Sequence, residues 1–146
     1  MINGYIPAAR FLPFLSWTDV AALPDKSNTV IVLPTGAIEQ HGPHLPCSVD
    51  SVISSGVAGH ALARLPATIP AYAIPPIVYG KSEEHLHFPG TLTLSGDTLL
   101  HTLLEIAESL YRAGFRKLLM INGHGGQPQI LQIACREMRL RHGDFI

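Results

Sequence analysis

Hydrophobic residues form two patterns along the chain: short continuous runs and longer stretches with helical spacing. The continuous runs cover residues 29–34 and 117–121. Because neither run has a polar face, both are predicted to be strands buried in a parallel sheet. Helical spacing recurs over residues 50–65, 95–112 and 127–142. A shorter helix is expected over residues 17–23, with Ser16 as its N-cap and Asp19 in its first turn.

Two other segments are less regular. Residues 69–78 are apolar but interrupted by three prolines, which predicts an edge strand or an irregular segment. Residues 80–94 contain two histidines and a Pro-Gly pair, and we expect a functional loop that leads into a short strand there. The alternation of strands with helices predicts a layered α/β fold with a largely parallel sheet. A length of 146 residues is that of one domain.

The composition limits the possible partners of the protein and its possible cellular locations. Charged residues make up 14 % of the chain, whereas about a quarter is usual. This deficit is explained either by a small, Ala-rich domain or by a surface that is covered, and we expect the second: a partner subunit in a homo-oligomer or further chain would cover it. The net charge of −1 comes with no dense basic patch, so no nucleic-acid partner is expected. No apolar run approaches the roughly 20 residues of a membrane span, and residues 1–15 lack a signal-peptide layout, so we expect a cytoplasmic protein without a membrane partner.

The first group of candidate residues follows the strand at 29–34. Glu39, His41 and Asp50 place two carboxylates and an imidazole within twelve positions, a ligand set that suits Zn²⁺, Mn²⁺ or Fe²⁺. Asp50 alone would be explained as a helix-capping residue, but a cap does not require the pair upstream. His44, which precedes Leu-Pro, is interpreted as a structural residue or one that orients a ligand.

The second group is the turn Asn122-Gly123-His124-Gly125-Gly126, directly after the strand at 117–121. Glycines let the backbone turn sharply and let a metal or substrate approach it. The amide of Gly125, at a helix N-terminus, is a candidate donor to an oxyanion. The alternatives are a tight structural turn or a nucleotide-binding loop, although the G-x-G-x-x-G spacing is absent. Both His-bearing turns fall at the carboxyl edge of the predicted sheet, where ligands of such folds bind.

A third group lies in the loop at 82–91. Ser82, Glu84 and His85 are candidates there if the loop covers the metal site: His85 for catalysis, and Ser82 and Glu84, together with Asn122, for binding the substrate. Solvent exposure alone would also explain this loop. The histidines on the predicted helices are expected to be ordinary surface or core residues.

These motifs together resemble the creatininase family. The matching stretches are residues 33–36, 39–46, 80–91 and 121–126, with Asp50 between them. The resemblance implies a three-layer α/β/α sandwich, homo-oligomers that are often hexamers, and a centre with two divalent metals, Zn or Mn with Fe as a further option. It also implies that Glu39 and His124 bind one metal, that His41 binds the other, and that Asp50 bridges them.

The chain departs from the family pattern at two points. Gly126 stands where creatininases proper carry a metal-binding Glu, and Gln127 stands where Asn is usual. The family domain is also considerably longer than 146 residues. The resemblance therefore implies that residues 1–146 are a single creatininase-like domain, either truncated at its C-terminus or a shortened homologue, and we expect truncation, with an incomplete second metal site.

The functional prediction is metal-dependent hydrolysis of a C–N bond in a small cyclic amide, a formamide or a peptide amide, with a non-peptide amide as the expected class. The main alternative is a catalytically impaired fragment that keeps the fold and binds one metal. A third hypothesis is a nucleotide-binding module that uses the glycine-rich turn.

Overall fold

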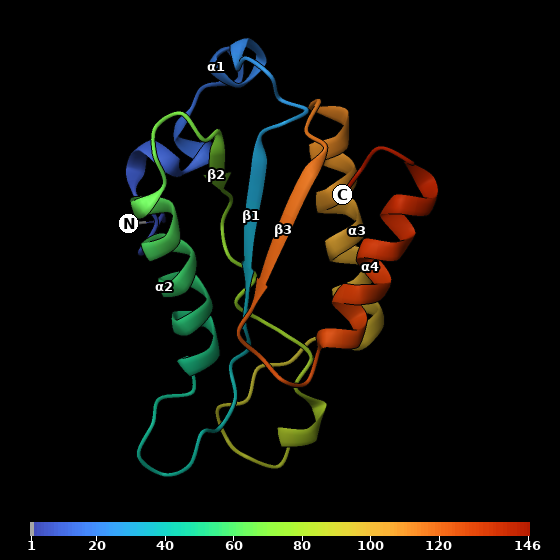
Figure 1. The fold of residues 1–146 in the computed structure, drawn as a ribbon. Helices are drawn as coiled ribbons and strands as arrows, with labels where there is room; N and C mark the ends of the chain where they lie inside the picture. The colour runs from blue at the N-terminus through green and yellow to red at the C-terminus, as the bar shows by residue number, and fades with distance from the viewer. Residues whose placement is uncertain (1) are drawn as a thin grey trace.

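The structure is a computed structural model that describes residues 2–146, and it forms three layers (Figure 1). Helix α2 covers one face of a central sheet, and α3 and α4 cover the other. This arrangement confirms the predicted α/β/α sandwich. The elements, in chain order, are η1 (Ala8–Arg10), η2 (Leu12–Phe14), α1 (Trp17–Ala22), β1 (Val30–Thr35), α2 (Val49–Arg64), β2 (Ala71–Ala73), η3 (Glu83–His85), α3 (Gly96–Arg112), β3 (Lys117–Asn122) and α4 (Pro128–Arg141).

The sheet has three parallel strands in the order β2-β1-β3. The central strand β1 is almost entirely buried, as its continuous apolar sequence predicts. Its side chains alternate between the two layers. Leu33 packs against α3 and α4, while Val32 packs with Ala58 and Leu62 of α2. Because β1 and β3 are in register up to the pair Thr35–Asn122, their carboxyl ends meet at one edge of the sheet.

Most predicted element boundaries are confirmed within two residues. Ser16 and Asp19 form a reciprocal capping box at the start of α1, and Ser95 caps α3. The proline-rich segment contributes the edge strand β2. The expected short strand within residues 80–94 is wrong. That segment forms η3 and a single bridge between Ile38 and Leu92, because only one backbone hydrogen bond joins these two stretches.

Helix α2 turns its larger apolar residues away from the sheet. Val52, Ile53 and Val57, whose spacing predicts the helix, are each more than 40 % exposed. The buried face consists mainly of small residues: Ser51, Ser54, Ala58 and Gly59. A Cβ atom at Gly59 would collide with the backbone of Tyr5. The small residues therefore let α2 lie close to the sheet and to the N-terminal segment.

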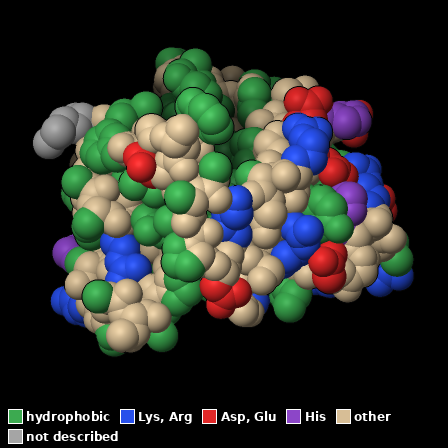
Figure 2. Space-filling view, turned by 90° about the horizontal axis from the view of Figure 1, so that it is seen from above, with side chains coloured by type: hydrophobic (Ala, Val, Ile, Leu, Met, Phe, Trp, Pro, Cys, Tyr) green, Lys and Arg blue, Asp and Glu red, His purple; other side chains and the backbone are tan. Residues whose placement is uncertain are grey.

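Other exposed surfaces differ in character. Seen from the end that carries α1, opposite the carboxyl edge of the sheet, charged and histidine side chains are most numerous on the right, and apolar side chains are most numerous at the top and upper left (Figure 2). Between α3 and α4, Glu108 forms ion pairs with Arg141 and His142. Leu140, near the end of α4, is 69 % exposed. Across residues 2–146, no helix has the length and hydrophobicity needed to cross a membrane.

Candidate metal centre

The candidate site lies at the carboxyl edge of the sheet, below β1 and β3 in Figure 1. The segment after β1 brings Glu39 and His41, the first turn of α2 brings Asp50, and the turn after β3 brings His124. The turn η3 closes the same region from the side. The four predicted metal-ligating residues are thus brought together from segments that are up to 85 positions apart in the chain.

A close backbone contact holds β3 against α2 at this point. A Cβ atom at Gly123 would collide with the carbonyl oxygen of Asp50. Only glycine therefore allows the turn after β3 to touch the first turn of α2. This contact places His124, the next residue, beside the Asp50 side chain.

Asp50 lies between two imidazole rings. Its Oδ1 atom is 2.9 Å from Nε2 of His41, and its Oδ2 atom is 3.0 Å from Nδ1 of His124. The side chain is buried, and Oδ2 has no hydrogen-bond partner among the described residues. Each carboxylate oxygen thus faces one ring nitrogen. A carboxylate that bridges two metal ions has this arrangement.

His41 is held by its own segment. Its Nδ1 atom lies 3.1 Å from the carbonyl oxygen of Glu39, and because a carbonyl only accepts, Nδ1 must donate. In the neutral ring, Nε2 then presents a lone pair toward Asp50. Burial alone would lower the pKa of His41, but the hydrogen bond to Glu39 and the charge of Asp50 outweigh it and raise the pKa above its ordinary value. A proton and a metal ion therefore compete for the same nitrogen.

His124 is almost fully buried and is oriented in a similar way. Its Nε2 atom donates to the carbonyl oxygen of Lys81 at 2.8 Å. In the neutral ring, Nδ1 is left without a proton, and it faces both Asp50 Oδ2 and Glu39 Oε1, the latter at 3.4 Å. A carbonyl acceptor on the far nitrogen is a common support for a metal-binding histidine.

Glu39 is buried, and its two oxygens have different neighbours. Oε1 faces His124, and Oε2 accepts a short hydrogen bond from the Ser82 hydroxyl. Ser82 is itself fully buried, and its amide donates to Thr93. Ser82 was predicted to bind the substrate. Its contacts instead favour a role in orienting Glu39.

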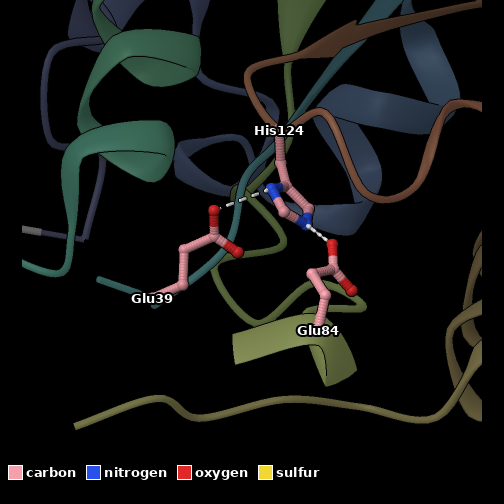
Figure 3. A group of neighbouring side chains, drawn as sticks. All are labelled: Glu39, Glu84 and His124. Atoms are coloured by element: carbon pink, nitrogen blue, oxygen red, sulfur yellow. Dashed lines mark ion pairs between the residues drawn. The ribbon is translucent and has the colours of Figure 1, made fainter. Parts of the chain in front are cut away.

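Glu84 lies on the opposite side of the His124 ring from Glu39 (Figure 3). Its Oε1 atom is 3.9 Å from Nε2 of His124, and its carboxylate also pairs with Lys81. Burial would raise the pKa of Glu84, but hydrogen bonds from its own amide and from Lys81 outweigh burial and lower it. Glu39, Glu84 and His124 lie close enough to form a possible metal group. Glu39, His41 and Asp50 form a second such group. The His124 ring separates Glu39 from Glu84, whereas Nδ1 of His124 faces both Glu39 and Asp50, so Asp50 suits a metal shared with His124 better than Glu84 does.

His85 faces the same site from η3. Its Nδ1 atom accepts from Nε2 of Gln40 at 3.3 Å, which leaves the proton of the neutral ring on Nε2. That Nε2 atom lies 3.7 Å from Glu39 Oε1. Because His85 is partly exposed, its N–H group lies between the buried carboxylate and solvent. Gly125 is also exposed, and the space where its side chain would be is open.

The structure adds Gln127, which the sequence prediction did not include among the site residues. Its buried amide donates to Gly36 and to Asn122 and accepts from the backbone of Lys81. Asn122 in turn donates to the carbonyl of His124 at 2.6 Å and accepts from its amide. Asn122 therefore stabilises the turn that carries His124. Its role in substrate binding stays a prediction. The sequence feature that could have identified Gln127 as a site residue is its position as a polar residue directly after the Gly-Gly pair.

The spacing of these donor atoms suits a divalent metal ion. Zinc lies about 2.0–2.2 Å from nitrogen and oxygen ligands, so two ligands of one ion are about 3 Å apart. The two contacts of Asp50, at 2.9 and 3.0 Å, match that spacing. The unpartnered Oδ2 atom of Asp50 also needs a positive neighbour. The residues present therefore fit a metal ion.

Sequence comparison identifies relatives with known activities. The profile of the family described as "Creatininase: Creatinine amidohydrolase" matches residues 13–146. A mycofactocin precursor peptide peptidase of Mycolicibacterium smegmatis is 37 % identical over 79 % of this chain and 47 % of its own length. A creatinine amidohydrolase of Pseudomonas putida is 34 % identical over 88 % of this chain and 52 % of its own length. The chain thus spans about half the length of these relatives.

Solved structures agree with the sequence matches. A structure described as "Creatininase Mn" superposes with a TM-score of 0.78 at 34 % identity, covering 94 % of this chain and 56 % of that chain. A mutant creatininase described as Zn-Zn type gives a TM-score of 0.78 at 33 % identity, covering 93 % and 55 %. With the family profile matched over nearly its whole length, this chain belongs to the creatininase family.

Proposed function

We propose that this chain forms part of a metal-dependent amidohydrolase that cleaves the C–N bond of an amide. The observation that carries the proposal is the position of Asp50, whose two oxygens face Nε2 of His41 and Nδ1 of His124. A carboxylate between two imidazoles, with one oxygen that lacks a hydrogen bond from residues 2–146, supports a two-metal hydrolytic site. Membership of the creatininase family supports the same chemistry.

The residues divide between two metal positions. Glu39, Asp50 and His124 would hold one ion, and His41 with Asp50 would hold the other. Zinc or manganese is the proposed metal, because creatininase structures of Mn and Zn-Zn types resemble this chain. When bound, such ions lower the pKa of water to near neutrality and polarise a carbonyl oxygen.

The remaining site residues position the substrate and move protons. The Nε2–H group of His85, beside Glu39 and near solvent, is placed to protonate a leaving nitrogen. The exposed amide of Gly125, just before α4, is placed to donate to the oxygen that gains negative charge. Lys81 and Glu84 form an ion pair beside His124. These two side chains are proposed to contact polar groups of the substrate.

The kind of amide that serves as substrate is the open part of this proposal. A non-peptide amide is the prediction from the sequence, but relatives described as mycofactocin precursor peptide peptidases extend the range to peptides. The experiment is therefore a hydrolysis assay with creatinine, a formamide and a short peptide, with added Mn²⁺ or Zn²⁺ and with a chelator. We expect metal-dependent hydrolysis, measured as creatine formed from creatinine or as amine released from the formamide and the peptide, that is lost in Glu39→Gln. Hydrolysis that persists in the chelator would overturn the proposal.

A second candidate is a fragment that binds one metal and hydrolyses amides weakly. The specific observation in its favour is that, among the described residues, the group around His41 consists of Glu39, His41 and Asp50, so the second position shares every ligand except His41 with the first. Metal content and turnover distinguish the two: one bound ion with little turnover favours this candidate, and two bound ions with ready turnover favour the first.

A further inference from the structure

The side chain of Gln127 joins three segments of the chain in the interior. It is fully buried, and its residue directly precedes α4. Its Nε2 atom donates to the carbonyl oxygen of Gly36 at 3.3 Å and to Oδ1 of Asn122 at 3.0 Å. Its Oε1 atom accepts from the backbone amide of Lys81 at 3.2 Å. One amide group therefore connects the ends of β1 and β3 to the segment that precedes η3.

The partners of Gln127 fix the orientation of its amide. A carbonyl oxygen only accepts, so the side of the amide that faces Gly36 must be the NH₂ group. A backbone amide only donates, so the side that faces Lys81 must be the oxygen. A Cβ atom at Gly80 would collide with Oε1 of Gln127. Glycine at that position therefore leaves the space that the amide occupies.

Two of the three partners of Gln127 also hold His124, whose Nδ1 atom faces the two buried carboxylates of the site. Asn122 contacts the backbone of His124: its Nδ2 atom donates to the carbonyl oxygen at 2.6 Å, and its Oδ1 atom accepts from the amide at 3.3 Å. The carbonyl oxygen of Lys81 accepts from Nε2 of the ring at 2.8 Å. Gln127 is thus linked both to the backbone and to the ring of this histidine.

The carbonyl group of Lys81 decides which nitrogen of His124 is open to a metal. Because this carbonyl accepts from Nε2, the neutral ring keeps its proton there and has its lone pair on Nδ1. The amide and the carbonyl of Lys81 belong to adjacent planar peptide units, which only the φ and ψ angles of this residue separate. The hydrogen bond from the Lys81 amide to Gln127 therefore restricts the direction in which the carbonyl points.

We propose that Gln127 is a positioning residue: its buried amide holds Lys81 and Asn122 so that His124 presents Nδ1 to the metal. This assignment rests on the proposed function, because it concerns a metal ligand of that site. It also gives a role to one of the two points at which the chain departs from the family pattern, where glutamine replaces the usual asparagine. Because an asparagine side chain is one methylene shorter, it could not reach all three partners from this backbone.

The first test uses the unmodified 146-residue chain. Nitrogen-15 NMR of the histidine rings, with His124→Ala to assign the signals, is recorded with a chelator in alkaline buffer, where the ring is neutral, and again with Zn²⁺. We expect the proton of His124 on Nε2 in both conditions. We also expect slow hydrogen exchange at the Lys81 amide, although Lys81 lies outside the helices and strands. A proton on Nδ1, or fast exchange at Lys81, would overturn the proposal. Neither readout depends on hydrolysis, so a failed amidase assay remains a separate result.

Variants of Gln127 separate positioning from the filling of space. Gln127→Met keeps the length of the side chain without its hydrogen bonds, and Gln127→Asn keeps the amide on a shorter side chain. In both we expect faster exchange at the Lys81 amide, a His124 proton shared between the two ring nitrogens, and metal affinity lower by about 10- to 100-fold. Gln132→Met, at an exposed position on α4, is the control and should match the unmodified chain. A folded Gln127→Met chain that keeps the Nε2 proton and the metal affinity of the control would overturn the proposal. If neither Gln127 variant folds, the measurements on the unmodified chain still decide.

Discussion

Asp50 Oδ2 lies 3.0 Å from Nδ1 of His124, yet it accepts no hydrogen bond from the described residues. The proton of neutral His124 is on Nε2, where it is donated to Lys81. Two lone pairs therefore face each other in a buried site, an arrangement that costs free energy unless a cation lies between them. This relationship links the fold to metal binding.

Replacement of His124 by alanine should remove most of the bound metal. The change deletes the nitrogen that faces both Asp50 and Glu39, so the first metal position loses one of its three protein ligands. His101→Ala is the control, because His101 is exposed on α3. Metal content after dialysis is the measurement. Equal metal in the two variants would refute the assignment.

The number of tightly bound metals should be one per chain. Glu39, Asp50 and His124 provide three ligands for one ion, which is enough for a site with an open position. The second position has only His41 as a ligand of its own and must share Asp50 and Glu39 with the first, because Gly126 cannot ligate through a side chain and Glu84 lies beyond the His124 ring. Titration with Mn²⁺ or Zn²⁺, followed by calorimetry, should show one strong and one weak event. Two strong events would require a ligand that these residues do not include.

Ser82→Ala should weaken metal binding without removing a ligand. The Ser82 hydroxyl donates to Glu39 and fixes the direction of its carboxylate, and the loss of such a support typically costs about 10- to 100-fold in metal affinity. Ser27→Ala, in an exposed turn, should leave the affinity unchanged. If Ser82 contacted only the substrate, the variant would bind metal as tightly as the unmodified chain.

A pH effect on stability is expected at the ion pairs between α3 and α4. Hydrogen bonds from His142 lower the pKa of Glu108 below its ordinary value of 4.5, and Arg141 adds to the effect. A carboxyl group whose pKa is lower in the folded state stabilises the fold above pH 4.5, and this contribution is lost as the pH falls through the folded-state pKa. Glu108→Gln should therefore flatten the acid dependence of unfolding below pH 4.5. Glu105→Gln, one turn earlier and exposed, should not.

Much of the fold could be predicted from the sequence because its signals are local. The continuous apolar runs gave β1 and β3, and Ser16 and Ser95 marked two helix starts. The buried face of α2 could not be predicted in this way. Val52, Ile53 and Val57 have helical spacing, but the sheet packs against the serine and glycine side, where the backbone approaches closely. That choice depends on tertiary contacts that periodicity does not record.

In the site, too, some features could be predicted from the sequence and others could not. Glu39, His41, Asp50 and His124 could be proposed from motifs after two strands, and their convergence followed from the parallel sheet. The orienting contacts could not. The hydrogen bonds from Ser82 to Glu39 and from Gln127 to the segments around it join residues 43 to 91 positions apart. Such pairings depend on the packing of loops, for which the sequence gives no spacing rule.

The two glycines after His124 provide a matched test of the site geometry. A Cβ atom at Gly126 would collide with Oε1 of Glu84 and with the ring of His124, whereas one at Gly125 would meet nothing within 4 Å. Neither glycine has a positive φ, so alanine adds only bulk at either position. Gly126→Ala should displace Glu84 or turn the His124 ring, and metal affinity should fall about tenfold or more because the ligand loses its orientation. Gly125→Ala should bind metal normally. Equal affinities in a titration of both variants would show that Glu84 and His124 adjust without cost, and that the contact over Gly126 does not position the ligand.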